Sequence, residues 1–130
     1  MKILGLDYGK AKIGLALGDT VTGLAEPVIV WPNSRFKVQS SKFIKANDIQ
    51  KIVIGLPGGK LDTEIKEFGK KLEKETGLPV EYFDETLTSI NAQEMLLQMK
   101  KKRKFRREME DAYAAAIMLE SYLEGGLAHV

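Results

Sequence analysis

The sequence predicts an α/β fold: a mixed five-stranded sheet flanked by helices, in a single domain over residues 1–130. Apolar runs typical of strands occupy residues 2–9, 13–18, 28–31, 51–56 and 79–83. The first three runs follow one another directly, whereas amphipathic helical patterns precede each of the last two. Consecutive strands favour antiparallel pairing and strands joined across a helix favour parallel pairing, so both kinds are expected in one sheet.

The first strand ends on a carboxylate, Asp7, next to Gly9. Residues 10–12 read as a tight turn, so the strand that follows forms a β-hairpin with the first. In that second strand Gly14, Ala16 and Gly18 alternate along one face. Such a nearly bare face would let another backbone or a ligand come close.

The later elements follow from the same patterns. The third strand comes after Pro27, and a helix over residues 36–46 leads to the β-branched run at 51–56, which is typical of a central parallel strand. Further helices are expected over 63–76, capped by Gly77; from Thr88 or Ser89 onward; and over 108–123, ended by Gly125 and Gly126.

Composition excludes several kinds of site. The chain has no Cys, which rules out disulfides, zinc ribbons and a thiol nucleophile, and its single His, His129, rules out a multi-histidine metal site. Any metal ion must therefore be held mainly by oxygen. No apolar run approaches the roughly 20 residues of a membrane span and no signal-peptide pattern is present, so we expect a cytoplasmic protein without membrane contact.

The charge is distributed very unevenly. Seven cations fall within eight consecutive positions: Lys100, Lys101, Lys102, Arg103, Lys104, Arg106 and Arg107. Outside this basic run, 13 Lys and Arg face 18 Asp and Glu, which leaves a formal charge of −5. A polyanion such as nucleic acid would therefore find one place to bind, and Phe105 could stack on a base or anchor the run to the core.

Three carboxylates from distant parts of the chain are candidates for a common site. Asp7 and Glu85 stand at the ends of predicted strands, where sites in α/β sheets collect. On the last helix, spacing places Asp111 on the inward face with Ala115, and Glu110 on the polar side. Converging carboxylates repel one another unless they share cations, and oxygen ligands select Mg²⁺ or Mn²⁺. A two-metal site could hydrolyse a phosphodiester without His or Cys.

Other carboxylates near these positions have simpler explanations. We interpret Asp62 as a helix N-cap and Asp19 as a turn residue. Asp84 and Glu85 are adjacent in an extended segment, so they point to opposite faces and only one can join the site. We choose Glu85.

Four motifs, in this order along the chain, resemble the YqgF family, also called RuvX or Holliday-junction-resolvase-like proteins and named as pre-16S rRNA nucleases. The motifs are residues 4–9 with 13–16, residues 54–57, residues 84–88, and residues 111–116 with Ile117, Leu119 and Glu120. The resemblance implies an RNase H-like fold and an acidic site that falls on Asp7, Glu85 and Asp111.

The chain departs from the family pattern at three places. Thr86 stands where the family commonly has arginine, so a phosphate contact or a group that orients Glu85 is missing. The loop after Pro57 is short, and Glu110 adds a negative charge beside Asp111. These departures bear on substrate choice and catalytic strength rather than on the fold.

The leading hypothesis is a metal-dependent endonuclease in ribosome biogenesis. Asp7, Glu85 and Asp111 would hold Mg²⁺ or Mn²⁺, the basic run would bind structured RNA, and the resemblance narrows the substrate to the 5′ end of the 16S rRNA precursor. Resolution of branched DNA by the same carboxylates is the first alternative, and a nucleic-acid-binding factor without catalysis is the second. A nucleotide-dependent phosphotransferase is disfavoured because Gly59-Lys60 is followed by Leu61, so the chain lacks a phosphate-binding G-x-x-x-x-G-K-[ST] loop.

Overall fold

The computed structural model describes residues 1–88, 90–102 and 106–128. In these parts of the chain, five strands form a sheet of order β3-β2-β1-β4-β5. The strands are β1 (Lys2–Tyr8), β2 (Lys12–Asp19), β3 (Ala25–Pro32), β4 (Ile49–Leu56) and β5 (Val80–Asp84). The β1–β2 and β2–β3 pairs are antiparallel, and the β1–β4 and β4–β5 pairs are parallel. The predicted mixed sheet is confirmed.

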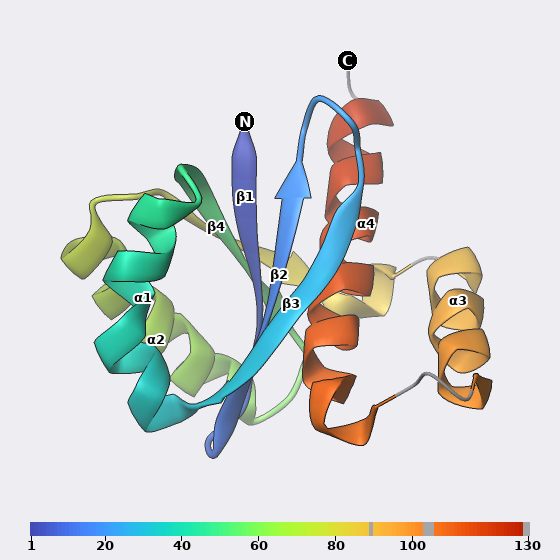
Figure 1. Ribbon diagram of the computed structural model, residues 1–130, viewed down its shortest axis with the longest axis horizontal. Coiled ribbons are helices and arrows are strands. Elements are labelled where there is room, and N and C mark those ends of the chain that lie inside the picture. Colours follow the sequence, from blue (N-terminus) through green and yellow to red (C-terminus); the bar gives the residue numbers. More distant parts are fainter. Residues whose placement is uncertain (89, 103–105, 129–130) are drawn as a thin grey trace.

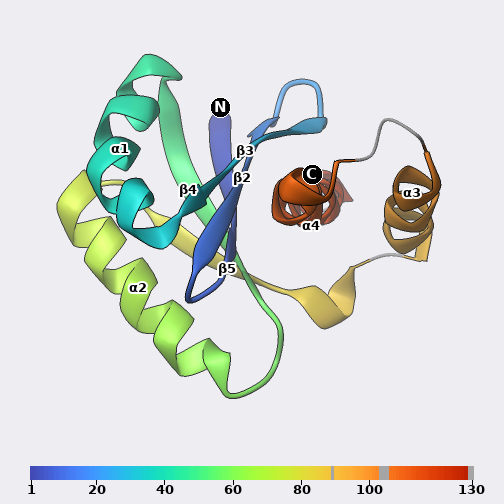
Figure 2. The same ribbon diagram turned by 60° about the horizontal axis from the view of Figure 1, so that its bottom comes forward.

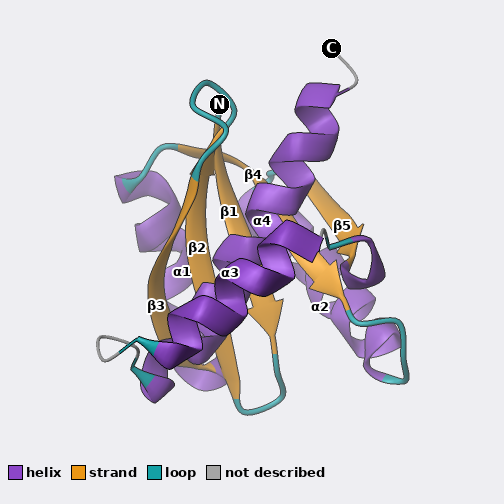
Figure 3. Cartoon of the chain, turned by 90° about the vertical axis from the view of Figure 1, so that its right-hand side faces the viewer, coloured by secondary structure: helices purple, strands orange, loops and turns teal. Residues whose placement is uncertain are grey.

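Helices cover both faces of the sheet. They are α1 (Asn33–Ala46), α2 (Leu61–Thr76), α3 (Ile90–Lys101) and α4 (Glu110–Ala128), with short 3₁₀ turns at η1 (Glu85–Leu87) and η2 (Arg107–Met109). Helices α1 and α2 lie on one face, and α4 lies on the other (Figures 1 and 2). Helix α3 stands on the outer side of α4, nearest the viewer in Figure 3, and buries only Ala92.

The main hydrophobic core lies between the sheet and the α1–α2 layer. It is built from large side chains at alternate positions of the central strands, such as Leu4, Leu6 and Ile54, which are fully buried. Phe36 of α1 and Ile65 of α2 close it from the helical side and are each 1% exposed. Alternation along β1 therefore directs Leu4 and Leu6 to this face and the intervening residues to the other.

The face beneath α4 is built from small residues. A Cβ atom on Gly5 would lie 3.0 Å from the Leu119 side chain, and one on Gly18 would lie 2.8 Å from it. Ala16 on β2 and Ala115 on α4 are fully buried between them. The bare face predicted for the second strand is thus filled by the α4 helix, which packs close to the sheet.

The end of the last helix differs from the prediction. Gly125 and Gly126 were expected to end it, but α4 continues through both to Ala128. Glycine costs a helix roughly 1 kcal/mol but leaves the backbone hydrogen bonds in place, so it need not stop one. Ser89, a proposed cap of α3, and His129 lie outside the described residues. No helix in the described ranges is long and apolar enough to cross a membrane.

Candidate active site

Asp7 lies near the end of β1, on the sheet face that α4 covers. Its partner in the β1–β2 register is Gly14. On the other side, Leu6 pairs with Ile54 of β4, so the next residue pair along the two parallel strands is Asp7 and Gly55. A glycine therefore flanks the carboxylate on each neighbouring strand, and both leave space above the sheet for groups from elsewhere in the chain.

Asp111, the second residue of α4, occupies the space above Gly14. A Cβ atom on Gly14 would overlap the backbone of Asp111 and Ala112, so only glycine permits this contact. The Asp111 side chain is 29% exposed and its Oδ2 lies 3.6 Å from Nζ of Lys12 on β2. The inward position that helical spacing predicts for Asp111 is confirmed, whereas Glu110 lies outward and pairs with Lys100 at 2.9 Å.

Glu85 occupies the corresponding space above Gly55. It is the first residue of η1, directly after β5, and its carboxylate would overlap a Cβ atom on Gly55. Its neighbour Asp84 has a structural role: its carboxylate accepts hydrogen bonds from the Thr86 amide at 2.9 Å and the Thr86 hydroxyl at 2.6 Å. The choice of Glu85 over Asp84 therefore agrees with the geometry, and Thr86 serves to hold the turn.

The electrostatics show that these groups influence one another. Burial, reinforced by the charges of Glu85 and Asp111, raises the pKa of Asp7 to about 7. The pKa of Glu85 is also raised, first by burial and then by the charges of Asp62 and Asp84. A carboxyl group whose pKa is raised this far by burial and like charges is typical of a functional site. A bound cation can offset the cost of ionising such a group.

Asp62 is a neighbour that the sequence interpretation missed. It is not the N-cap of α2, a position that Lys60 takes. Instead it lies in the first turn of α2, accepts a hydrogen bond from the Gly58 amide at 3.1 Å, and is close enough to Glu85 to raise the pKa of that group. The start of α2 therefore lies close to Glu85, which directly follows β5.

The candidate carboxylate ligands can be compared with what a divalent metal ion requires. Within residues 1–88, 90–102 and 106–128, no three His, Cys, Asp or Glu side chains stand close enough together to hold a metal ion. Glu85 and Asp111 lie near Asp7 without forming a closed ligand set, and Asp111 has Lys12 as its cationic neighbour. The chemistry nevertheless fits a hard cation, since the charged groups that act on Asp7 are the carboxylates of Glu85 and Asp111.

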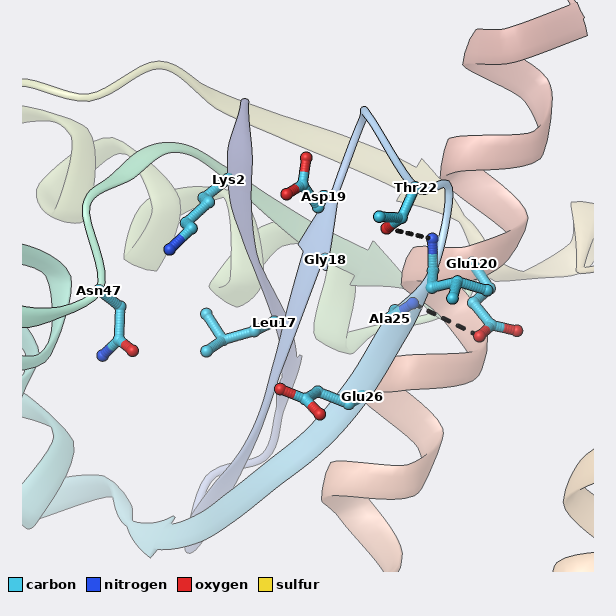
Figure 4. Close-up of a pocket in the computed structure, with 10 residues that line it drawn as sticks. Lys2, Leu17, Gly18, Asp19, Thr22, Ala25, Glu26, Asn47 and Glu120 are labelled. Atoms are coloured by element: carbon cyan, nitrogen blue, oxygen red, sulfur yellow. Dashed lines mark hydrogen bonds between the residues drawn. The ribbon is translucent and has the colours of Figure 1, made fainter.

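A cavity of about 250 Å³ opens beside two of these carboxylates. Asp7 and Asp111 line it together with the β1–β2 turn, including Lys10 and Lys12. A larger cavity, of about 540 Å³, lies at the opposite end of the sheet (Figure 4). There Glu120 accepts a hydrogen bond from the Ala25 amide at 3.4 Å, and the carboxylates of Asp19, Glu26 and Glu120 outnumber the single cation, Lys2. Of these two cavities, the smaller one, with two lysines beside its two carboxylates, is better suited to a reacting phosphate.

The predicted basic run is only partly available as a binding surface. Lys100 and Lys101 end α3, Lys102 follows, and Arg106 and Arg107 precede α4. Arg103 and Lys104, as well as Phe105, lie outside the described residues. Two cations are paired with carboxylates, Lys100 with Glu110 and Arg106 with Glu108 at 3.1 Å. The run ends at Arg107, three residues before α4 begins with Glu110 and Asp111.

Curated relatives match the chain over nearly its whole length. A protein of Syntrophomonas wolfei is 33% identical over 135 residues, covering 97% of this chain and 96% of the relative. Proteins of Syntrophus aciditrophicus and Rhodopirellula baltica are each 37% identical and cover 95% of this chain, with 89% and 76% of the relatives matched. All three are provisionally named pre-16S rRNA nuclease.

Solved structures confirm the RNase H-like fold. Thermus thermophilus RuvC in complex with a Holliday junction substrate has a TM-score of 0.62 at 16% identity, covering 97% of this chain and 96% of RuvC. The fowlpox virus Holliday junction resolvase has a TM-score of 0.60 at 12% identity, with 96% and 99% covered. A family model described as RuvX, Holliday junction resolvase, matches residues 1–125. The chain therefore belongs to the RuvX family.

Proposed function

We propose that this protein is a divalent-metal-dependent endonuclease whose site is formed by Asp7, Glu85 and Asp111. One observation carries the proposal: Gly14 and Gly55 beside Asp7 leave room for Asp111 and Glu85, and burial together with these two charges raises the pKa of Asp7 to about 7. A bound cation would offset both the cost of the buried charge and the repulsion between the carboxylates. Asp7, Glu85 and Asp111 would hold Mg²⁺ or Mn²⁺, which when bound supplies Lewis acidity for phosphodiester hydrolysis.

The protein's own residues would orient the substrate around this site. The glycines beside Asp7 fix how closely Asp111 and Glu85 approach it. Lys12, 55% exposed and 3.6 Å from Asp111, lines the cavity where a scissile phosphate would lie. The basic run would hold the flanking backbone with an affinity that falls as salt rises.

The proposed substrate is structured RNA, at the 5′ end of the 16S rRNA precursor, processed in the cytoplasm. The shared name of the relatives, pre-16S rRNA nuclease, supports this choice. The test is Mg²⁺-dependent cleavage of a precursor RNA by purified protein. Asp7→Asn should reduce the rate by about two orders of magnitude or more, since it removes the central carboxylate. Cleavage at the wild-type rate by this variant would refute the assignment.

Resolution of a four-way DNA junction is the second candidate. The family description and the solved neighbours that bind such junctions favour it. Because the same carboxylates would act on both substrates, the discriminating measurement is a comparison of their cleavage rates. An intact four-way junction should be cut into paired nicked duplexes at a rate above that of the RNA if this candidate is right. Such resolution normally needs two sites, so a monomer on the junction would count against it.

A further inference from the structure

A second cationic surface lies on the side of the sheet opposite α4. Five lysines line a groove of about 830 Å³ between the β1–β2 turn, the start of α1 and the length of α2: Lys10, Lys37, Lys70, Lys71 and Lys74. We call this surface the lysine groove. Its lysines come from three separate segments of the chain, so no run of charge in the sequence marks it.

Most of this charge is not neutralised. Among the described residues, Lys37, Lys70, Lys71 and Lys74 have no carboxylate at ion-pairing distance. Glu64 and Glu67 also line the groove. Glu64 already has a cationic partner, because its Oε1 lies 3.8 Å from Lys10 Nζ. The groove therefore offers four exposed ammonium groups to a ligand that carries several negative charges.

The groove is continuous with the proposed active site. Tyr8 and Lys10 line both the lysine groove and the cavity that contains Asp7 and Asp111. Tyr8 follows Asp7 in β1, and its side chain turns to the other face of the sheet, where the hydroxyl donates a hydrogen bond to Glu64 Oε2 at 2.7 Å. A chain-like ligand can thus pass from the carboxylates over the β1–β2 turn into the groove.

The floor of the groove is held in place by aromatic packing. The Tyr8 ring lies 4.7 Å from the Phe68 ring, which in turn lies 5.6 Å from the buried ring of Phe36. The lysines of α2 therefore stand on a helix whose backbone is fixed to the core, while their long side chains stay free to adapt to a ligand. Several exposed cations beside a cleavage site suit a ligand with repeated negative charges, such as a row of phosphates.

We propose that the lysine groove binds the sugar-phosphate backbone of the nucleic acid whose scissile phosphate lies at Asp7. The inference rests on the proposed nuclease function and adds a second contact region to it, on the α1–α2 side of the molecule. The substrate would then be held on both sides of the cleaved bond, by the basic run that precedes α4 and by the lysine groove beyond Tyr8. Contacts on both sides require a substrate with a structured segment that extends past the cleaved bond.

The test compares two double variants of equal charge change. Lys37→Gln/Lys71→Gln removes one groove lysine from each helix, whereas Lys42→Gln/Lys66→Gln removes one exposed lysine from each of the same helices outside the groove. Affinity for a labelled RNA hairpin with a single-stranded 5′ extension is measured without divalent ions over a range of salt. The groove variant should bind about tenfold more weakly, and its log–log salt slope should fall by about 1 to 2, as expected for two lost phosphate contacts. The control should resemble the wild type.

Equal losses in the two variants, or no RNA binding by the wild type, would overturn the inference. Because no cleavage occurs under these conditions, this result is independent of the Asp7→Asn test of the nuclease assignment. A second measurement avoids mutations altogether. Lysine acetylation followed by mass spectrometry should show protection of Lys37 and Lys71 by the RNA hairpin, with Lys42 and Lys66 unprotected. Protection of the groove lysines by an acidic protein but not by RNA would also refute the proposal.

Discussion

On the sheet face covered by α1 and α2, β1 presents Leu4 and Leu6, both fully buried under large side chains. On the face covered by α4, the same strand presents Gly5 and Asp7. The first face gains stability from buried apolar volume, whereas the second gives up side-chain volume so that Asp111 can approach Asp7. Stability and chemistry are therefore separated across a single sheet, and substitutions on the two faces should have different consequences.

Phe36→Ala should have the largest effect on stability. Phe36 is 1% exposed and packs against Trp31 and Phe68, with ring centroids 6.5 and 5.6 Å away. Removing such a ring from a core costs about 3–5 kcal/mol of unfolding free energy. Urea unfolding measures the loss, and Val38→Ala, at a position 76% exposed on the same helix, is the matched control. Cleavage per folded molecule should stay unchanged, and a selective loss of activity would contradict the separation of the two faces.

Gly14→Ala should have a smaller effect on stability but should also impair activity. The added methyl group would overlap the Asp111 backbone, so α4 must shift at a cost of about 1–3 kcal/mol. Since the shift moves a proposed ligand away from Asp7, the cleavage rate should fall even where the protein is fully folded. Gly59→Ala, where a Cβ atom meets nothing within 4 Å, is the control and should change neither property. Full activity in Gly14→Ala would show that the position of Asp111 is not critical.

Stability in the absence of metal should depend on pH through Asp7. Its pKa is about 7 in the folded chain and near 3.8 when unfolded, so between these values the folded state binds a proton that the unfolded state lacks. The free energy of unfolding should therefore fall as pH rises from about 4 to about 7, by about 2 kcal/mol after allowance for solvent screening. Asp7→Asn removes this term, so the difference between the two proteins isolates it from the other carboxylates.

Thermal unfolding in a chelator, repeated at several pH values, measures this difference. Adding Mg²⁺ above pH 7 should restore stability to the wild type and not to Asp7→Asn, because the ion replaces the proton. A difference between the two proteins that does not change with pH would show that the ionisation of Asp7 is not linked to folding.

The sequence allowed the sheet, the helix order and the inward position of Asp111 to be predicted, because each depends on local periodicity. Alternation along 2–8 and the i+4 spacing of Asp111 and Ala115 both survive in the structure. What brings Asp111 and Glu85 next to Asp7 is different. It depends on strand order and on glycines at matching registers, Gly14 and Gly55, which have meaning only once the strands are paired.

The two basic surfaces also differ in whether the sequence alone reveals them. The basic run at 100–107 is visible in the sequence because its cations are consecutive. The lysine groove is not, because α1, α2 and the β1–β2 turn each contribute a few lysines that only the fold brings together. Spacing along a chain reveals a contiguous feature, whereas a surface assembled from separate elements requires their packing to be known.

Lys12→Gln should have the smallest effect on stability, and it tests whether an ion binds near Asp111 on the α4 face. The ion pair between Lys12 and Asp111 spans 3.6 Å with side chains 55% and 29% exposed, so its loss should cost less than about 1 kcal/mol. Its removal leaves the carboxylates around Asp7 with less positive charge nearby, so Mg²⁺ should raise the unfolding temperature at lower concentration than in the wild type. Lys2→Gln, at the far end of β1, is the control and should leave the Mg²⁺ dependence unaltered. An identical Mg²⁺ titration for Lys12→Gln and wild type would mean that the ion does not bind near Asp111, and the site would then have to be centred on Asp7 and Glu85.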